Sequence, residues 1–176
     1  TPQHSGLPVI AIDTENKKGI NDKENYISSV ITVIDPDNTE YDLEATAGVR
    51  GRGNSTWGYP KKPYRIKFDK KQSLFGYEKA KSWVLLADYQ DPTLLMNHIA
   101  FELGHRFELA YTNHANHVEL YLNGKHQGAY VLTEQVQVNP GRVDIDEETG
   151  FLVELDSYMD EEYKFYDPIL LKKALD

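Results

Sequence analysis

The residues best suited to chemistry lie in one basic stretch, residues 50–71. This stretch carries eight of the nineteen Lys and Arg side chains but only one of the twenty-eight Asp and Glu side chains. The formal net charge of the whole chain is −9 at pH 7, so the positive charge is strongly localised. Such a concentration of charge in an acidic protein indicates an anion-binding site. Its basic residues are Arg50, Arg52, Lys61, Lys62, Arg65, Lys67, Lys70 and Lys71.

Small and polar residues near the start of this stretch favour a turn that could hold phosphate. Gly51 and Gly53 allow positive φ and close approach of the backbone to a ligand, and residues 54–56 offer short polar side chains and amides. Residues 63–69 then alternate as a strand that presents Lys67. A glycine-rich turn followed by a strand with lysines can hold the phosphates of a nucleotide. The spacing matches neither the P-loop nor the dinucleotide-binding fingerprint, so a solvated basic turn remains an alternative.

The composition predicts one soluble domain of ordinary size. A chain of 176 residues can bury a core without cross-links, and the absence of cysteine excludes disulfides and thiolate chemistry. No apolar run is long enough to span a bilayer, and the acidic balance argues against general nucleic-acid binding. We therefore interpret residues 1–6 as a leader segment and residues 7–176 as a single domain.

Alternating β-branched and aromatic residues predict a mostly antiparallel sheet of about five to seven strands. Residues 26–35 and 41–49 should form one hairpin, since a turn-forming Asp-Pro-Asp-Asn sequence separates them. A second hairpin is expected around Asn123 and Gly124. The expected strands are residues 7–13, 26–35, 41–49, 63–69, 82–88, 117–122, 129–136 and 151–155.

One helix is expected after the strand at residues 82–88. Asp91 is a suitable N-cap and Pro92 suits the first helical position. Leu95, Ile99 and Leu103 recur on one stripe, which should pack on the sheet. The expected fold class is therefore α+β, a mostly antiparallel sheet with one principal helix.

Two further groups of residues suggest other kinds of site. Residues 144–167 carry ten acidic side chains, which suit Mg²⁺ or Ca²⁺ but lack the EF-hand spacing, so a solvated acidic face is favoured. The basic stretch could instead form salt bridges with these acids.

Trp57, Tyr59 and Tyr64 could stack on a sugar, although aromatic residues on strands usually belong to the core. The six histidines show no metal-ligand spacing, and no acyl-transfer nucleophile is visible.

Several longer motifs resemble the CotH family of atypical, spore-coat-type protein kinases. They are, in order, RGRGNSTW, KKPYRIKFDKK, LFG, ADYQDPTLLMNHIAFELG and LYLNGKHQGAYVLTEQV. The resemblance runs from about residue 7 to residue 158. It implies the N-terminal lobe of a kinase-like fold, ATP and Mg²⁺ as cofactors, and Ser or Thr side chains of coat or surface proteins as acceptors. It also implies a bacterial, secreted protein of the cell surface or spore coat.

The resemblance also places residues in the nucleotide site. By matching motif positions, Arg52, Lys61 and Lys62 would contact phosphate, with Lys67 as a further contact. Glu134 would lie on the strand that leads toward the hinge between the lobes.

Two more roles and one absence follow from the same resemblance. Asn97 and Glu102, on the expected helix, would help to position a lysine. The family's catalytic aspartate and its Trp-Asp-x-Asp metal segment lie beyond the matched region, so no residue here is expected to be the catalytic base. The expected function is thus the nucleotide-binding half of a kinase, itself inactive. The alternative is a non-catalytic surface or carbohydrate-associated module on the same scaffold.

Overall fold

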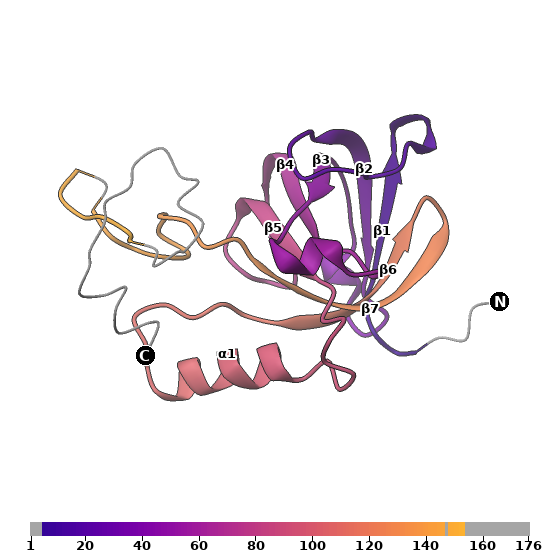
Figure 1. The fold of residues 1–176 in the computed structure, drawn as a ribbon. Coiled ribbons are helices and arrows are strands. Elements are labelled where there is room, and N and C mark those ends of the chain that lie inside the picture. The colour runs from indigo at the N-terminus through magenta and orange to yellow at the C-terminus, as the bar shows by residue number, and fades with distance from the viewer. Residues whose placement is uncertain (1–4, 147, 154–176) are drawn as a thin grey trace. The chain divides into compact units, whose positions relative to one another are not determined.

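The computed structural model describes residues 5–146 and 148–153, and the chain divides into two compact units, Thr1–Ile145 and Asp146–Asp176. The first unit is built on a closed barrel of seven strands (Figure 1). Neighbouring strands follow the order β1-β2-β3-β4-β5-β7-β6, and β1 pairs with β6 to close the ring. The strands are β1 (Val9–Thr14), β2 (Ile27–Ile34), β3 (Leu43–Gly51), β4 (Tyr64–Gln72), β5 (Ala80–Leu86), β6 (Asn116–Leu122) and β7 (Lys125–Glu134). The helices are α1 (Met96–Arg106) and the 3₁₀ turns η1 (Glu15–Lys17), η2 (Thr39–Tyr41) and η3 (Ser55–Gly58).

Alternation of side chains along the strands explains how the barrel is filled. In β1, and in β4 from Tyr64 to Phe68, every second residue is buried, because successive side chains of a strand point to opposite faces. The inward side chains form a packed core rather than a channel. The largest of them are Ile10, Ile12, Ile31, Ile66, Phe68, Trp83, Leu85, Leu120, Tyr130 and Leu132.

The pairing of β1 with β6 is parallel, whereas every other neighbouring pair in the barrel is antiparallel. The β6–β7 hairpin turns at Asn123 and Gly124, with φ of 53° and 80°, as a tight hairpin requires. The side-chain oxygen of Asn123 accepts hydrogen bonds from the backbone N–H of Thr14, at 2.9 Å, and from its hydroxyl, at 3.0 Å. The turn of the predicted hairpin therefore also holds the last residue of β1 through its hydrogen bonds with Thr14.

The expected fold class, α+β with one principal helix as in a kinase-like lobe, is wrong. The sheet closes on itself into a mixed barrel, and the described residues contain a single short α-helix. Local patterns specify strands and turns, but they do not reveal that residues 9–12 lie beside residues 119–122. Closure of the barrel therefore cannot be predicted from local sequence patterns.

The helix also begins later than expected and lies differently. Leu94 has a φ of 57°, which interrupts any helix started at Pro92, so α1 begins at Met96. Its apolar stripe does not pack on the sheet as predicted, because Leu95, Ile99 and Leu103 are 46%, 52% and 46% exposed. This stripe remains open in the described part of the chain.

The second unit is described only at residues 146 and 148–153. Asp146 accepts hydrogen bonds from the hydroxyl of Thr149, at 2.9 Å, and from the N–H groups of Thr149, at 2.8 Å, and Glu148, at 2.9 Å. These bonds fix a turn and lower the pKa of this carboxyl, the hydroxyl bond most. Residues 151–153 do not form the expected strand, and residues 154–155 lie outside the described residues. Among the described helices none has the length and apolar character needed to cross a membrane.

Candidate functional site

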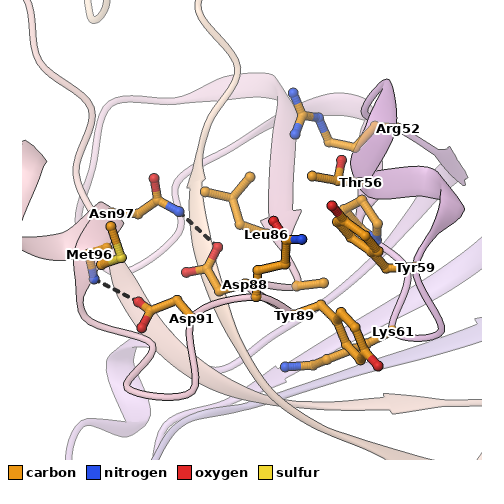
Figure 2. A pocket seen from close by; sticks show the side chains of 13 residues that line it. Arg52, Thr56, Tyr59, Lys61, Leu86, Asp88, Tyr89, Asp91, Met96 and Asn97 are labelled. Carbon is orange, nitrogen blue, oxygen red and sulfur yellow. Dashed lines mark hydrogen bonds between the residues drawn. The ribbon is translucent and has the colours of Figure 1, made fainter.

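One end of the barrel carries a cavity of about 300 Å³ (Figure 2). One wall is the loop between β3 and β4, residues 52–63, and the other is the segment between β5 and α1, residues 86–97. The cavity thus joins the glycine-rich turn of the basic stretch to the start of the helix. It brings together three residues predicted for the nucleotide site: Arg52, Lys61 and Asn97.

Two glycines shape the first wall in different ways. Gly53 has a φ of 84°, and an added Cβ would lie 2.0 Å from the hydroxyl oxygen of Thr56. Gly51 is needed for close approach, since an added Cβ would lie 2.4 Å from the ring of Trp57. The N–H of Gly51 donates to the carbonyl of Asp22 at 2.8 Å. These contacts fold the turn tightly, so that Arg52 and Thr56 line the cavity.

This wall carries two cationic groups, and the barrel holds one of them, the Lys61 ammonium, in place. The ammonium of Lys61 donates to the carbonyl of Ala129 and lies 4.5 Å from the centroid of the Tyr130 ring. Burial lowers the pKa of Lys61, an effect that the charge of Asp88 partly offsets. Burial also lowers the pKa of the Arg52 guanidinium, which nonetheless stays charged. The wall therefore presents two partly desolvated cations, of which the Lys61 ammonium is held by contacts with β7.

The opposite wall is acidic. Asp88, with a φ of 45°, follows β5 and accepts a hydrogen bond from the Asn97 side chain at 2.8 Å (Figure 2). Its second oxygen, Oδ2, is buried and has no hydrogen-bond partner among the described residues. Burial raises the pKa of this carboxyl, and the neighbouring charge of Asp91 raises it further. Asp91 itself is used in the turn, where it accepts from the N–H groups of Thr93 and Met96.

Four predicted residues do not line this cavity: Lys62, Lys67, Glu102 and Glu134. Lys62 donates to the carbonyl of Trp57 at 2.6 Å and so braces the loop from within. Lys67 is exposed on β4, 5.9 Å from the centroid of the Tyr26 ring. Glu102 forms an exposed i,i+4 ion pair with Arg106 at 2.9 Å. Of the predicted basic contacts, the cavity therefore gathers Arg52 and Lys61 only.

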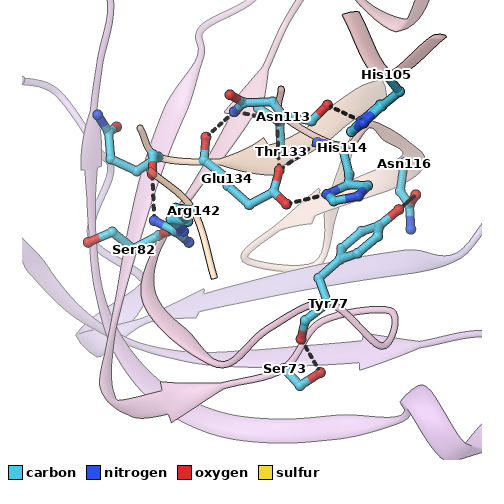
Figure 3. A network of polar contacts seen from close by, with 11 residues as sticks. Ser73, Tyr77, Ser82, His105, Asn113, His114, Asn116, Thr133, Glu134 and Arg142 are labelled. Atoms are coloured by element: carbon cyan, nitrogen blue, oxygen red, sulfur yellow. Dashed lines mark hydrogen bonds and ion pairs between the residues drawn. The ribbon is translucent and has the colours of Figure 1, made fainter. Parts of the chain in front are cut away.

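Glu134, the one predicted site residue that is buried, belongs to a polar network at the end of β7 (Figure 3). Its carboxylate accepts from the backbone N–H of His114 at 2.8 Å and pairs with the imidazole Nδ1 at 2.7 Å. The side chain of Asn113 donates to the carbonyl of Glu134 at 2.7 Å, and the carbonyl of Asn113 contacts His105 on α1 at 3.0 Å. In this arrangement Glu134 anchors the segment that follows α1.

The aromatic residues considered for sugar stacking separate into core and surface. Tyr64 is buried and lies beside Tyr130 in the core, with ring centroids 6.3 Å apart. Trp57 packs over Gly51. Tyr59 lines the cavity and stacks on Tyr89, with centroids 5.4 Å apart. Of the three candidates, Tyr59 is therefore the one at the cavity.

Two further hypotheses from the sequence were salt bridges between the basic stretch and the acidic residues 144–167, and a metal site formed by those acids. Within residues 5–146 and 148–153 no ion pair joins the basic stretch to an acid, and most of the acidic residues 144–167 lie outside the described part. That same part contains no group of three or more His, Asp or Glu side chains able to hold a metal ion. The sequence reasoning missed Asp88, whose signal was a charged residue directly after a continuous apolar strand.

The comparison with protein families assigns the chain. Residues 49–172 match the CotH family, described as CotH kinase protein. Because this match covers most of the 176 residues, the chain belongs to the CotH family. Both walls of the cavity lie within the matched region. No curated protein matches the chain significantly.

Proposed function

We propose that the cavity binds the phosphates of ATP and that the chain is the nucleotide-binding part of a CotH-family protein kinase. One observation carries the proposal: the cavity lining brings Arg52 and Lys61 together with Asp88, whose Oδ2 has no hydrogen-bond partner among the described residues. A site with cations and a carboxylate on opposite sides suits a phosphate chain with its metal ion. The family description, a kinase protein, agrees with this chemistry.

The cationic wall supplies the phosphate contacts. The Arg52 guanidinium can donate two parallel hydrogen bonds to phosphate oxygens, whereas the Lys61 ammonium acts as a point charge. The hydroxyl of Thr56, beside them, can donate a further hydrogen bond. Because both cations are already partly desolvated, their interaction with an anion is stronger than at an open surface.

The acidic wall fits the magnesium ion that accompanies ATP. Mg²⁺ is usually bound by one or two carboxylates together with substrate phosphates, and Asp88 offers a buried oxygen that has no other partner. Asn97 holds the other oxygen of Asp88 and so sets the direction of the carboxylate. When bound, the metal would neutralise charge that develops on the phosphates.

The remaining parts of the proposal concern the whole kinase. The phosphoryl acceptors are Ser or Thr side chains of coat or cell-surface proteins, and the protein acts outside the cell or on its surface. Catalytic groups beyond those described here would complete the transfer.

Isothermal titration with MgATP tests the nucleotide site. Lys61→Ala and Arg52→Ala should each weaken binding about 10-fold to 100-fold, since a hydrogen bond to a charged group is worth about 1.5–3 kcal/mol. Lys71→Ala removes the same charge from an exposed position of β4 and is the matched control, with an expected change below about twofold. Absence of binding, or equal losses in Lys61→Ala and Lys71→Ala, would exclude the proposal.

The stacked Tyr59 and Tyr89 favour a second candidate, a carbohydrate-associated module. Tyr89 is 50% exposed beside the cavity, and exposed aromatic faces can stack on sugar rings. This candidate predicts retention on a polysaccharide matrix that is lost in Tyr59→Ala and kept in Trp57→Phe. Unretarded passage of the wild-type chain would count against it.

A further inference from the structure

Two arginines lie directly opposite each other on the outer face of the barrel. Arg50 on β3 pairs in register with Arg65 on β4. Both alternate with buried residues, Val49 and Gly51 on β3 and Tyr64 and Ile66 on β4, so their side chains leave the barrel on the same side. Like charges directly opposite in an antiparallel pair repel each other. The fold therefore places two positive charges where they disfavour one another.

These arginines have no partner that offsets the repulsion among the residues the structure describes. The Nε atoms of Arg50 and Arg65 are both buried and make no hydrogen bond there. Neither guanidinium takes part in an ion pair within that part of the chain. The ion pairs found there are Lys17–Asp13, Arg106–Glu102, His114–Glu134 and His126–Glu119.

Lys67 and Tyr26 complete this surface, which we call the Arg50–Arg65 face. Lys67 is two residues after Arg65 and points to the same side of β4. The Tyr26 ring covers Gly48, where an added Cβ would lie 2.9 Å from the Tyr26 Cβ. The Arg50 guanidinium lies 5.1 Å from the centroid of that ring. Packing on Tyr26 limits the orientations open to the Arg50 side chain.

We propose that the Arg50–Arg65 face is a second anion site, which binds a phosphate group beside the cavity. The Nε atoms are buried, so the terminal nitrogens of the two guanidinium groups are the donors to the oxyanion. Two such groups from adjacent strands can hold one tetrahedral dianion and remove their mutual repulsion. Neither arginine lines the cavity, but their charges act on Arg52, which does, so the two sites are neighbours.

The phosphate can belong to free inorganic phosphate or to a phosphorylated side chain, and titration distinguishes these sources. The chain is titrated with sodium phosphate, with a phosphoserine peptide and with the unphosphorylated peptide, at constant ionic strength. Tighter binding of the phosphopeptide than of phosphate supports a phosphorylated side chain as ligand. Equal or weaker binding of the phosphopeptide supports free phosphate. Failure of both phosphate ligands to bind overturns the proposal.

Variants locate the site and separate it from the cavity. Arg65→Gln should weaken phosphate binding at least 10-fold, whereas Lys71→Gln should leave it within twofold. An equal loss in Lys71→Gln and Arg65→Gln would overturn the proposal, because it would show that total charge, and not this face, determines binding. A parallel titration with MgATP keeps the two sites distinguishable, because Lys61→Ala should weaken MgATP binding more than Arg65→Gln does.

The melting temperature provides a second readout. Without phosphate and at low salt, Arg65→Gln should melt higher than the wild type, because one repelling charge is removed. Phosphate should raise the melting temperature of the wild type more than that of the variant. A lower melting temperature for the variant without phosphate, together with an unchanged response to phosphate, would contradict the proposal.

Discussion

The hydroxyl of Tyr130 donates to the carbonyl of Lys62 at 3.0 Å, while its ring lies 4.5 Å from the ammonium of Lys61. Tyr130 is buried in the core on β7, so one core side chain holds two successive residues of the cavity loop. Burial raises the pKa of Tyr130, which remains a neutral donor at physiological pH.

Tyr130→Phe should therefore destabilise the protein by about 1 kcal/mol, because the Lys62 carbonyl loses its donor. Urea unfolding measures this change. The ring that lies beside Lys61 is retained, so MgATP affinity should fall less than in Lys61→Ala. An unfolding free energy equal to that of the wild type would show that the hydrogen bond is not made.

The glycine-rich turn offers a matched pair of substitutions. Gly53→Ala should destabilise the protein by at least about 1–2 kcal/mol, since a non-glycine residue is strained at a φ of 84° and its Cβ would meet Thr56. Gly58→Ala is the control, because no atom lies within 4 Å of an added Cβ there. Thermal melting and MgATP titration of both variants check the prediction. Similar melting temperatures for the two variants would contradict it.

The cavity carboxylate should make stability depend on pH. Burial raises the pKa of Asp88, so the folded protein holds this proton more tightly than the unfolded chain. Folding therefore disfavours the ionised carboxylate of Asp88. This loss of stability is fully present above the raised pKa of the folded protein and disappears as the pH falls to the pKa of the unfolded chain, 3.8. Asp88→Asn should gain stability relative to the wild type as the pH rises from about 3 to about 7.

Asp91 provides a control of opposite sign for this experiment. Its hydrogen bond with Thr93 lowers the pKa of the Asp91 carboxyl, so the ionised form stabilises the fold above 3.8. Asp91→Asn should accordingly lose stability relative to the wild type over the same rise in pH. Urea unfolding at several pH values measures both slopes. Slopes of the same sign in the two variants would refute this assignment of environments.

The exposed stripe of α1 predicts unusual tolerance to polar substitution. Ile99→Gln and Leu103→Gln should each change the unfolding free energy by less than about 1 kcal/mol, because these side chains are about half exposed. Leu120→Ala, at a fully buried core position, should cost about 2–5 kcal/mol. Chemical unfolding compares the three variants. A loss in Ile99→Gln as large as that in Leu120→Ala would show that the stripe is covered.

The strands and hairpins could be predicted from sequence because their signals are local. The Asn123-Gly124 turn and the alternation in β4 are each contained within a few residues. Barrel closure depends on a pairing between β1 and β6, which are about a hundred residues apart, and no local pattern encodes it. The start of α1 was misplaced for a different reason, because Leu94 adopts a left-handed conformation that its type disfavours.

The candidate site was predictable only in part. Charge density and glycine spacing pointed to the loop that carries Arg52 and Lys61. The acidic wall was not found, since a single Asp88 after a strand resembles any charged loop residue. Lys67 could not be distinguished from Lys61 by sequence, because strand alternation alone does not state which face of a barrel borders a site.

The place where the barrel closes sets a limit on how the protein can be shortened. The family match begins at residue 49, near the end of β3, and so leaves out β1 and β2. A fragment cut at that boundary would lack β1 and β2, the two strands that lie between β6 and β3 in the closed barrel. Strand β6 and the remnant of β3 would then become unprotected edges. Unprotected edges recruit strands from other molecules, so such a fragment should self-associate rather than fold as a monomer. The smallest unit that can be produced on its own therefore has to begin ahead of Val9, upstream of the family boundary.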